Sequence, residues 1–187
     1  SLLHEYLRTS YFHLRNIGAI RKYLDSDSAA QIIHAFVTSR LDYCNSLFHG
    51  ITDKLMYRLI KIQNTAVRII TLCNPQDNIT PHLKHLHWLP VPLRIKFKML
   101  LMTYKILNGL APSYLYDLLI PLELPHDLRS IEMENLKVPR SRTVTYGDRA
   151  FAIAAPQLWN ELPVEVRNVP TLTLFKTKLK THLFDEF

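Results

Sequence analysis

The stretch TDKLMYRLIKIQNTAVRIITLC, residues 52–73, decides the fold class, because its side chains recur with the period of an α-helix. Thr52 suits the N-cap position, and Asp53 suits the positive end of the helix dipole. At about 100° per residue, one face collects Leu55, Leu59, Ile62, Ala66, Ile69 and Cys73. A second face, within roughly 80° of arc, collects the cations Lys54, Arg58, Lys61 and Arg68. The pattern predicts a helix that packs with one face and meets negative charge with the other.

The chain before this stretch is also expected to be helical. Residues 2–24 place apolar side chains at helical spacing, at Leu3, Leu7, Tyr11, Leu14 and Ile17. Ser26 or Asp27 can cap another helix that runs to about Leu41. Its inward positions are expected to be Ile32, Ile33, Phe36 and Val37.

Further helices are expected after residue 73. The segment Asn74–Asn78 is a break by composition, and Thr80-Pro81 restarts a short helix. The next helix is expected from about Val91 to Asn108. A second basic stripe lines one side of it, made of Arg94, Lys98 and Lys105.

The character of the sequence changes after Pro121. Leu136–Arg142 and Thr143–Tyr146 are expected to form two short strands around a basic turn. Thr171 can cap a last helix over residues 172–184, with the inward side chains Phe175, Leu179 and Leu183. The expected fold class is mainly α: a helical bundle over residues 1–78, then a smaller α+β C-terminal region over 79–187 with a short β-hairpin.

The charge balance is basic. Lys and Arg total 23 against 16 Asp and Glu, which gives a net charge of +7. Such a balance favours polyanionic partners, nucleic acid or an anionic membrane, unless it is merely a basic surface. The longest apolar runs, such as residues 99–102, are too short to cross a bilayer, so no membrane partner is expected. The first residues have neither an initiator Met nor a signal-peptide layout, so the chain is expected to be part of something longer.

The chemistry of an enzyme is not found in the sequence. A nucleotide polymerase needs two or three carboxylates that hold two metal ions, and this chain has no adjacent Asp pair. There is no Walker-type phosphate loop and no Gly-x-Ser-x-Gly motif. We therefore expect no catalytic residues, no cofactor and no small-molecule substrate.

Cysteine and histidine give only a weak sign of metal binding. Cys44 and Cys73 lie in apolar helical patterns and are expected to be buried free thiols. Cys73 precedes a histidine cluster beside Trp88, made of His82, His85 and His87. Zinc ligands usually come in two sets at fixed spacing, and no second cysteine is close, so no metal site is expected. Partial burial, hydrogen bonding or contact with phosphate is the expected role of these histidines.

An arginine cluster is the stronger sign in the second half of the chain. It consists of Arg140, Arg142 and Arg149, which lie within ten residues. The planar guanidinium fork donates two hydrogen bonds to a phosphate at once. The alternative for each arginine is an internal ion pair with Asp148, Glu161 or Glu165. The full set of expected nucleic-acid-binding residues is this cluster together with the two basic stripes.

Several longer strings carry a family resemblance. In the first part of the chain they are HAFVTSRLDYCN (34–45), IQNTAVR (62–68), LHWLPV (86–91) and TYKILNG (103–109). Downstream they are VPRSR (138–142), GDRAF (147–151), AAPQLWN (154–160), LP (162–163) and FKTKLKTHLF (175–184). In order, they resemble the C-terminal end of the reverse transcriptase of jockey-like and Rex-like non-LTR retrotransposons, which are LINE-like elements.

This resemblance implies a parent protein with an endonuclease and an RNA-directed DNA polymerase. Residues 1–78 would correspond to the helical thumb, which packs against the primer–template duplex, and 79–187 to the region that follows. The chain would then lack the catalytic core and would bind RNA or DNA without sequence preference, beside the upstream polymerase core. An intracellular location, nuclear or cytoplasmic, is implied as well. The alternatives are a protein-interaction or structural module, or a decayed copy with no present function.

Overall fold

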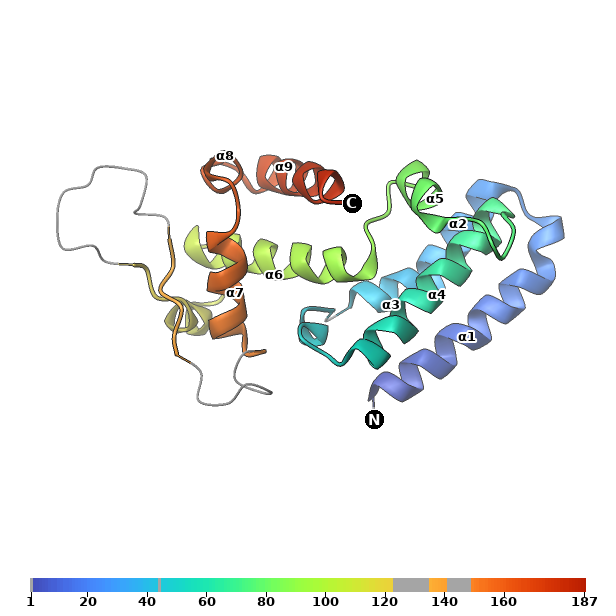
Figure 1. Ribbon diagram of the computed structural model, residues 1–187, viewed down its shortest axis with the longest axis horizontal. Coiled ribbons are helices and arrows are strands. Elements are labelled where there is room, and N and C mark those ends of the chain that lie inside the picture. The colour runs from blue at the N-terminus through green and yellow to red at the C-terminus, as the bar shows by residue number, and fades with distance from the viewer. Residues whose placement is uncertain (1, 44, 123–134, 141–148) are drawn as a thin grey trace. The chain divides into compact units, whose positions relative to one another are not determined.

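The chain folds into helices that form two compact units, residues 1–94 and 95–187. The structure is a computed structural model that describes residues 2–43, 45–122, 135–140 and 149–187 (Figure 1). The expected mainly helical class is confirmed. None of the described helices combines the length and the apolar character that a membrane crossing requires.

The first unit is built around the helix that the sequence singled out. This helix, α4 (Asp53–Thr71), packs against α1 (Leu2–Ile20) and α2 (Ser26–Ile33). Its buried side chains are Leu59, Ile62, Gln63, Ala66, Val67 and Ile70. Three of the six predicted core positions are therefore buried, whereas Leu55 and Ile69 are half-buried. The sixth, Cys73, lies beyond the end of the helix and is half-buried rather than buried.

Hydrogen bonds connect the C-terminal end of α1 with the C-terminal end of α4. A short 3-10 turn (Arg21–Tyr23) follows α1, and its first residue caps α4. The Arg21 guanidinium donates to the carbonyls of Ile69 at 2.7 Å and Ile70 at 2.8 Å. These carbonyls belong to the last turn of α4, where backbone acceptors have no partner inside the helix and a cation is favoured by the dipole. α1 and α4 therefore end side by side (Figure 1).

The helix that starts at Ser26 continues through a π-helical turn (His34–Thr38) into α3 (Ser39–Asp42). It is capped by Asp25 rather than by the expected Ser26 or Asp27. The Asp25 carboxylate accepts from the Ser28 amide at 2.7 Å and from the Ser28 hydroxyl at 3.2 Å. These hydrogen bonds from Ser28 lower the pKa of the Asp25 carboxyl.

One predicted core residue of this helix is wrong, and the π-helical turn explains why. Ile33 and Val37 are buried as expected, but Phe36 is 46% exposed. The wider turn shifts the register of the buried face, so that Thr38 and Leu41 continue it instead. Tyr11 of α1 is likewise 38% exposed, because Leu7, Ser10, Leu14 and Ile17 form the inner face of that helix.

The short helix α5 (Ile79–His85) and the loop after it also belong to the first unit. Gln63 of α4 is buried, and its amide donates to the Leu89 carbonyl at 2.8 Å. Its oxygen accepts from the Val91 amide at 3.0 Å. Since α5 packs on α4 and Gln63 bonds the following loop, the first unit extends to residue 94.

The second unit has an aromatic core. It contains α6 (Val91–Leu107) from Ile95 onward, a 3-10 turn (Ser113–Leu118), α7 (Phe151–Asn160), α8 (Val164–Arg167) and α9 (Leu172–Asp185). The Tyr104 and Phe175 rings stack at 4.2 Å, and Trp159 lies 5.9 Å from Phe175. The Tyr104 hydroxyl donates to the Val169 carbonyl at 2.8 Å, so the buried polar end of this ring is satisfied.

The expected β-hairpin is not found in the described residues. Leu136 forms an isolated antiparallel bridge with Pro121 instead of pairing with a strand that follows it. Asn160 of α7 explains this choice, because its amide group bonds both the N–H and the C=O of Leu136, each at 2.8 Å. The second predicted strand, 143–146, lies outside the described residues.

The inward face of α9 was predicted correctly. Phe175, Leu179 and Leu183 are each 0% exposed. We expect Phe175→Ala to lower the free energy of unfolding by about 3–5 kcal/mol, because it removes a ring from a closed core. Urea denaturation followed by circular dichroism measures this. Leu174→Ala, at a neighbouring position that is 40% exposed, is the control and should cost less than about 1 kcal/mol. Equal losses in the two variants would show that α9 is not docked.

Candidate nucleic-acid interface

The outward face of α4 presents three cations of the first basic stripe to solvent. Lys54 and Lys61 are exposed, and Arg58 is half-exposed. All three point away from the buried side chains, because about 150° of helical rotation separates the centres of the two faces. Among the described residues, no carboxylate forms an ion pair with them. Their charge is therefore available to an external anion.

An exposed aromatic ring lies among these cations. Tyr57 of α4 is 58% exposed, and the Lys61 ammonium lies 4.7 Å from the centre of its ring. A cation beside an accessible ring is the combination that single-stranded nucleic acids meet in their binding grooves, where bases stack and phosphates are neutralised. We call Lys54, Tyr57, Arg58 and Lys61 the α4 face.

Arg68, the fourth predicted cation of this stripe, differs from the other three. It is half-buried, and its Nε is enclosed without a hydrogen-bond partner within the described part of the chain. A substitution of Arg68 would change the packing of α4 as well as the charge. It is therefore a poorer probe of binding than the α4 face.

Arg94 is engaged inside the first unit. Its Nη1 donates to both oxygens of Asp42 at 3.0 Å, and its Nε donates to the Leu89 carbonyl at 2.8 Å. The guanidinium also lies 5.4 Å from the centre of the Trp88 ring. These contacts fix the loop before α6 to the end of α3. The alternative of internal pairing, considered above for the arginine cluster, thus applies to Arg94.

The remaining predicted cations belong to the second unit. Lys98 and Lys105 lie on α6 and are half-buried, so only part of each side chain can meet a ligand. Arg140 is exposed, Arg149 is half-buried, and Arg142 lies outside the described residues. None of these cations belongs to the unit that contains α4.

A second basic and aromatic surface was missed by sequence reasoning. On α1, the exposed side chains Arg8, Tyr11, Phe12 and Arg15 share one face, within about 100° of arc. The i, i+3, i+4, i+7 spacing of these four residues in the sequence indicates that they share one helix face. It was overlooked because Tyr11 was counted among the core positions.

The aromatic surface of α1 continues onto the helix that contains the π-helical turn. The His13 ring stacks on Phe36 at 5.1 Å, and Phe12 meets His13 edge-on at 5.6 Å. Phe12 is 60% exposed. Exposed phenyl rings in contact with a polar ring offer a surface for planar ligands or for another apolar surface.

The structure also brings together possible metal ligands. Cys73 and His82, two of the four residues weighed for zinc, lie close to Asp77, which was not considered. Neither His85 nor His87 belongs to this group within the described part of the chain. The group is separate from the α4 face.

Comparisons of the chain with models of protein families, with curated proteins and with solved structures find no match.

The contrast between Arg94 and the α4 face is testable. We expect Arg94→Ala to lower the free energy of unfolding by about 1–3 kcal/mol, because it removes the charged hydrogen bonds to Asp42 and to the Leu89 carbonyl, which keeps only the bond from Gln63. Its effect on the salt dependence of nucleic-acid binding should be negligible. Thermal denaturation and an anisotropy titration measure the two effects. A stable Arg94→Ala variant with a shallower salt dependence would assign Arg94 to the interface instead.

Proposed function

We propose that this chain binds the backbone of RNA or DNA without sequence preference, through the first unit and chiefly through the α4 face. The observation that carries the proposal is the α4 face itself: three cations and one exposed ring on a helix whose opposite face is buried. The rigid core below fixes the spacing of the cations. A preformed array loses less conformational freedom on binding than cations on a flexible segment.

The mechanism is electrostatic. Each Lys or Arg that neutralises a phosphate releases a condensed counterion, which makes affinity fall with salt. The Debye length is about 8 Å at physiological ionic strength, so only cations that approach the backbone closely contribute. Lys54, Arg58 and Lys61 occupy successive turns of α4, so that they can follow consecutive phosphates.

Single strands are the expected substrate class. Tyr57 can stack on a base only if that base is not already stacked within a duplex. The exposed rings of α1, Tyr11 and Phe12, supply the same chemistry next to Arg8 and Arg15.

The resemblance to non-LTR retrotransposon proteins supports binding to a nucleic-acid backbone, but it does not bear on the preference for single strands. In such a protein the first unit would act as the thumb, and the polymerase core upstream would carry the catalytic carboxylates. We accordingly propose that the chain is a non-catalytic part of an RNA-directed DNA polymerase. Its contribution would be to hold primer and template.

A second candidate function is protein association. The observation that favours it is the exposed aromatic surface formed by Phe12, His13 and Phe36. A neighbouring protein, such as the polymerase core that the resemblance implies, could cover this surface. Light scattering at several salt concentrations separates the two functions, because self-association through apolar groups persists at high salt.

The salt dependence of binding tests the α4 face. We expect the triple variant Lys54→Ala, Arg58→Ala, Lys61→Ala to bind a single-stranded oligonucleotide with a shallower log–log salt slope. The decrease should be up to about 2, at roughly 0.7 per phosphate. Fluorescence anisotropy from low to moderate salt measures the slopes, and the melting temperature should barely change.

A charge-matched control distinguishes a local interface from net charge. The exposed lysines Lys137, Lys176 and Lys180 lie in the second unit, and their replacement by Ala removes the same three charges. This control should keep the wild-type slope. Equal slopes in both triple variants would reject the α4 face as the binding site.

The ring of Tyr57 should contribute without affecting the slope. We expect Tyr57→Ala to weaken binding to single strands by about 5- to 150-fold, the range for loss of one base stack. Binding to duplexes should change much less. Tyr114→Ala, at a ring in the second unit that is 72% exposed, is the control. If both variants bind single strands as tightly as wild type does, base stacking on α4 is excluded.

A further inference from the structure

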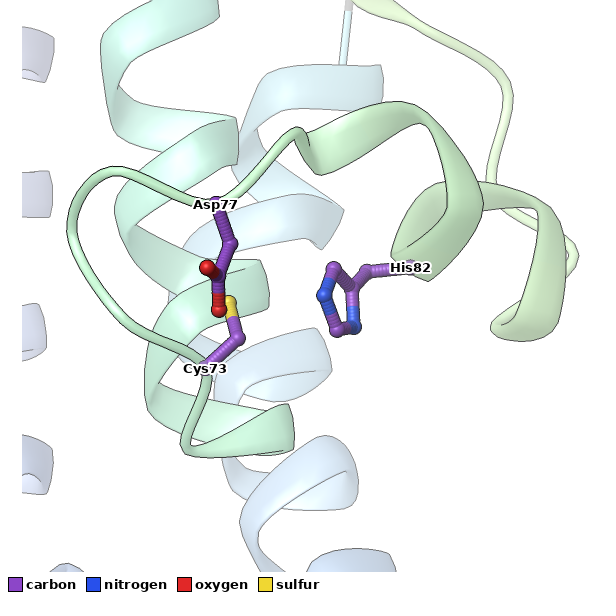
Figure 2. Close-up of side chains that lie close together, drawn as sticks. All are labelled: Cys73, Asp77 and His82. Atoms are coloured by element: carbon purple, nitrogen blue, oxygen red, sulfur yellow. The ribbon is translucent and has the colours of Figure 1, made fainter.

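Three side chains of different chemistry converge where the chain passes from α4 to α5 (Figure 2). The sulfur of Cys73, a carboxylate oxygen of Asp77 and a ring nitrogen of His82 all lie within 4.8 Å of one another. Cys73 and His82 are half-buried, and Asp77 is exposed. The group is therefore partly enclosed by protein and open on one side.

The backbone of this connection explains why the three groups meet. Leu72 ends α4 in the left-handed conformation, with φ 55°, and turns the chain back at Cys73. The turn Asn74–Asp77 is closed by a backbone bond of 3.1 Å from the Asp77 amide to the Asn74 carbonyl. Asn78 then caps α5 through a 3.0 Å bond from the Thr80 amide. His82 on α5 consequently faces the end of α4 (Figure 2).

The carboxylate is held in place by the same turn. One oxygen of Asp77 accepts from the Asn74 amide at 2.8 Å. Metal-bound carboxylates are commonly oriented by such a hydrogen bond from outside the site. The other oxygen remains available as a ligand.

We propose that Cys73, Asp77 and His82 bind a divalent transition metal ion, zinc in the first place. A thiolate, an imidazole and a carboxylate are the three ligand types that zinc accepts. The hard ions Mg²⁺ and Ca²⁺ prefer sites made of oxygen alone. Water or another small ligand would complete the tetrahedron on the open side. This site goes beyond the proposed function and does not depend on it.

The distances between the three candidate ligand atoms allow a zinc ion to bind after a small adjustment of the side chains. Bonds of about 2.0–2.3 Å place the ligand atoms of a tetrahedral zinc ion roughly 3.3–3.8 Å apart. The ligand atoms must therefore approach one another by up to about 1.5 Å, which small side-chain rotations of Cys73, Asp77 and His82 can supply. Binding displaces the thiol proton of Cys73 to solvent, so affinity should rise with pH. The ion would then join the end of α4 to α5.

Cobalt(II) is the probe for this site, because a thiolate bound to it gives a charge-transfer absorption band. We expect titration of the full chain with Co²⁺ to produce this band at one ion per chain, and added Zn²⁺ to remove it. Cys73→Ser should abolish the band although Cys44 is still present. Asp77→Asn and His82→Gln should each weaken Co²⁺ binding by at least 10-fold.

His85→Gln provides the matched control. His85 lies on the same helix, is exposed and does not belong to the group, so its replacement should leave the titration unchanged. Circular dichroism of each metal-free variant checks that it is folded. Saturating Zn²⁺ should also raise the melting temperature of wild type by a few degrees, up to about 10 °C, whereas Mg²⁺ should not.

Three results would overturn the proposal. The first is the absence of a charge-transfer band in the folded wild-type chain. The second is a band that persists in Cys73→Ser, which would assign the ion to another thiol. The third is an equal effect of His82→Gln and His85→Gln, which would show that the ion is held by surface histidines in general.

Discussion

The burial of one face of α4 is the constraint on which the first unit depends. Leu59, Ala66 and Val67 are 0% exposed, and Ile62 and Ile70 are 1% exposed. Each large apolar side chain contributes about 1.5–3 kcal/mol when it leaves water. A rotation of α4 about its axis would expose several of them at once. The same burial therefore fixes which side chains remain outside, and these are the cations of the α4 face.

Polar contacts then satisfy the buried ends of the elements that pack on α4. Arg21 bonds the last carbonyls of the helix, and Gln63 bonds both the carbonyl of Leu89 and the amide of Val91. Buried backbone groups that lost these partners would cost about 1–3 kcal/mol each. Side chains used in this way are not available to a ligand. The first unit thus divides its polar residues into internal ones, such as Arg21 and Arg94, and those that point to solvent.

The separation of internal from solvent-facing polar residues also shows which features could be predicted from the sequence and which could not. Periodicity identified α4, its basic stripe and the inward face of α9, because each of these depends on spacing within one helix. Periodicity also placed Arg94 in a basic stripe. Spacing within one helix carries no information on Asp42, the ion-pair partner of Arg94, which lies 52 residues away in the chain. Phe36 was assigned to the core because a π-helical turn changes the register without a clear sign in the sequence. Asp77 was not considered as a candidate metal ligand, because the turn that brings it to Cys73 depends on the left-handed residue Leu72.

Mapping bound nucleic acid on the surface of the full chain tests most directly whether the α4 face is the binding site. Amide chemical shifts measured by NMR during titration with a mixed-sequence single-stranded oligonucleotide supply that map. If the α4 face binds nucleic acid, the largest changes will fall on α4 around Lys54–Lys61, with a second group on α1 around Arg8–Arg15. Changes of equal size on the exposed lysines of α9, or no changes in the first unit, would contradict binding at the α4 face.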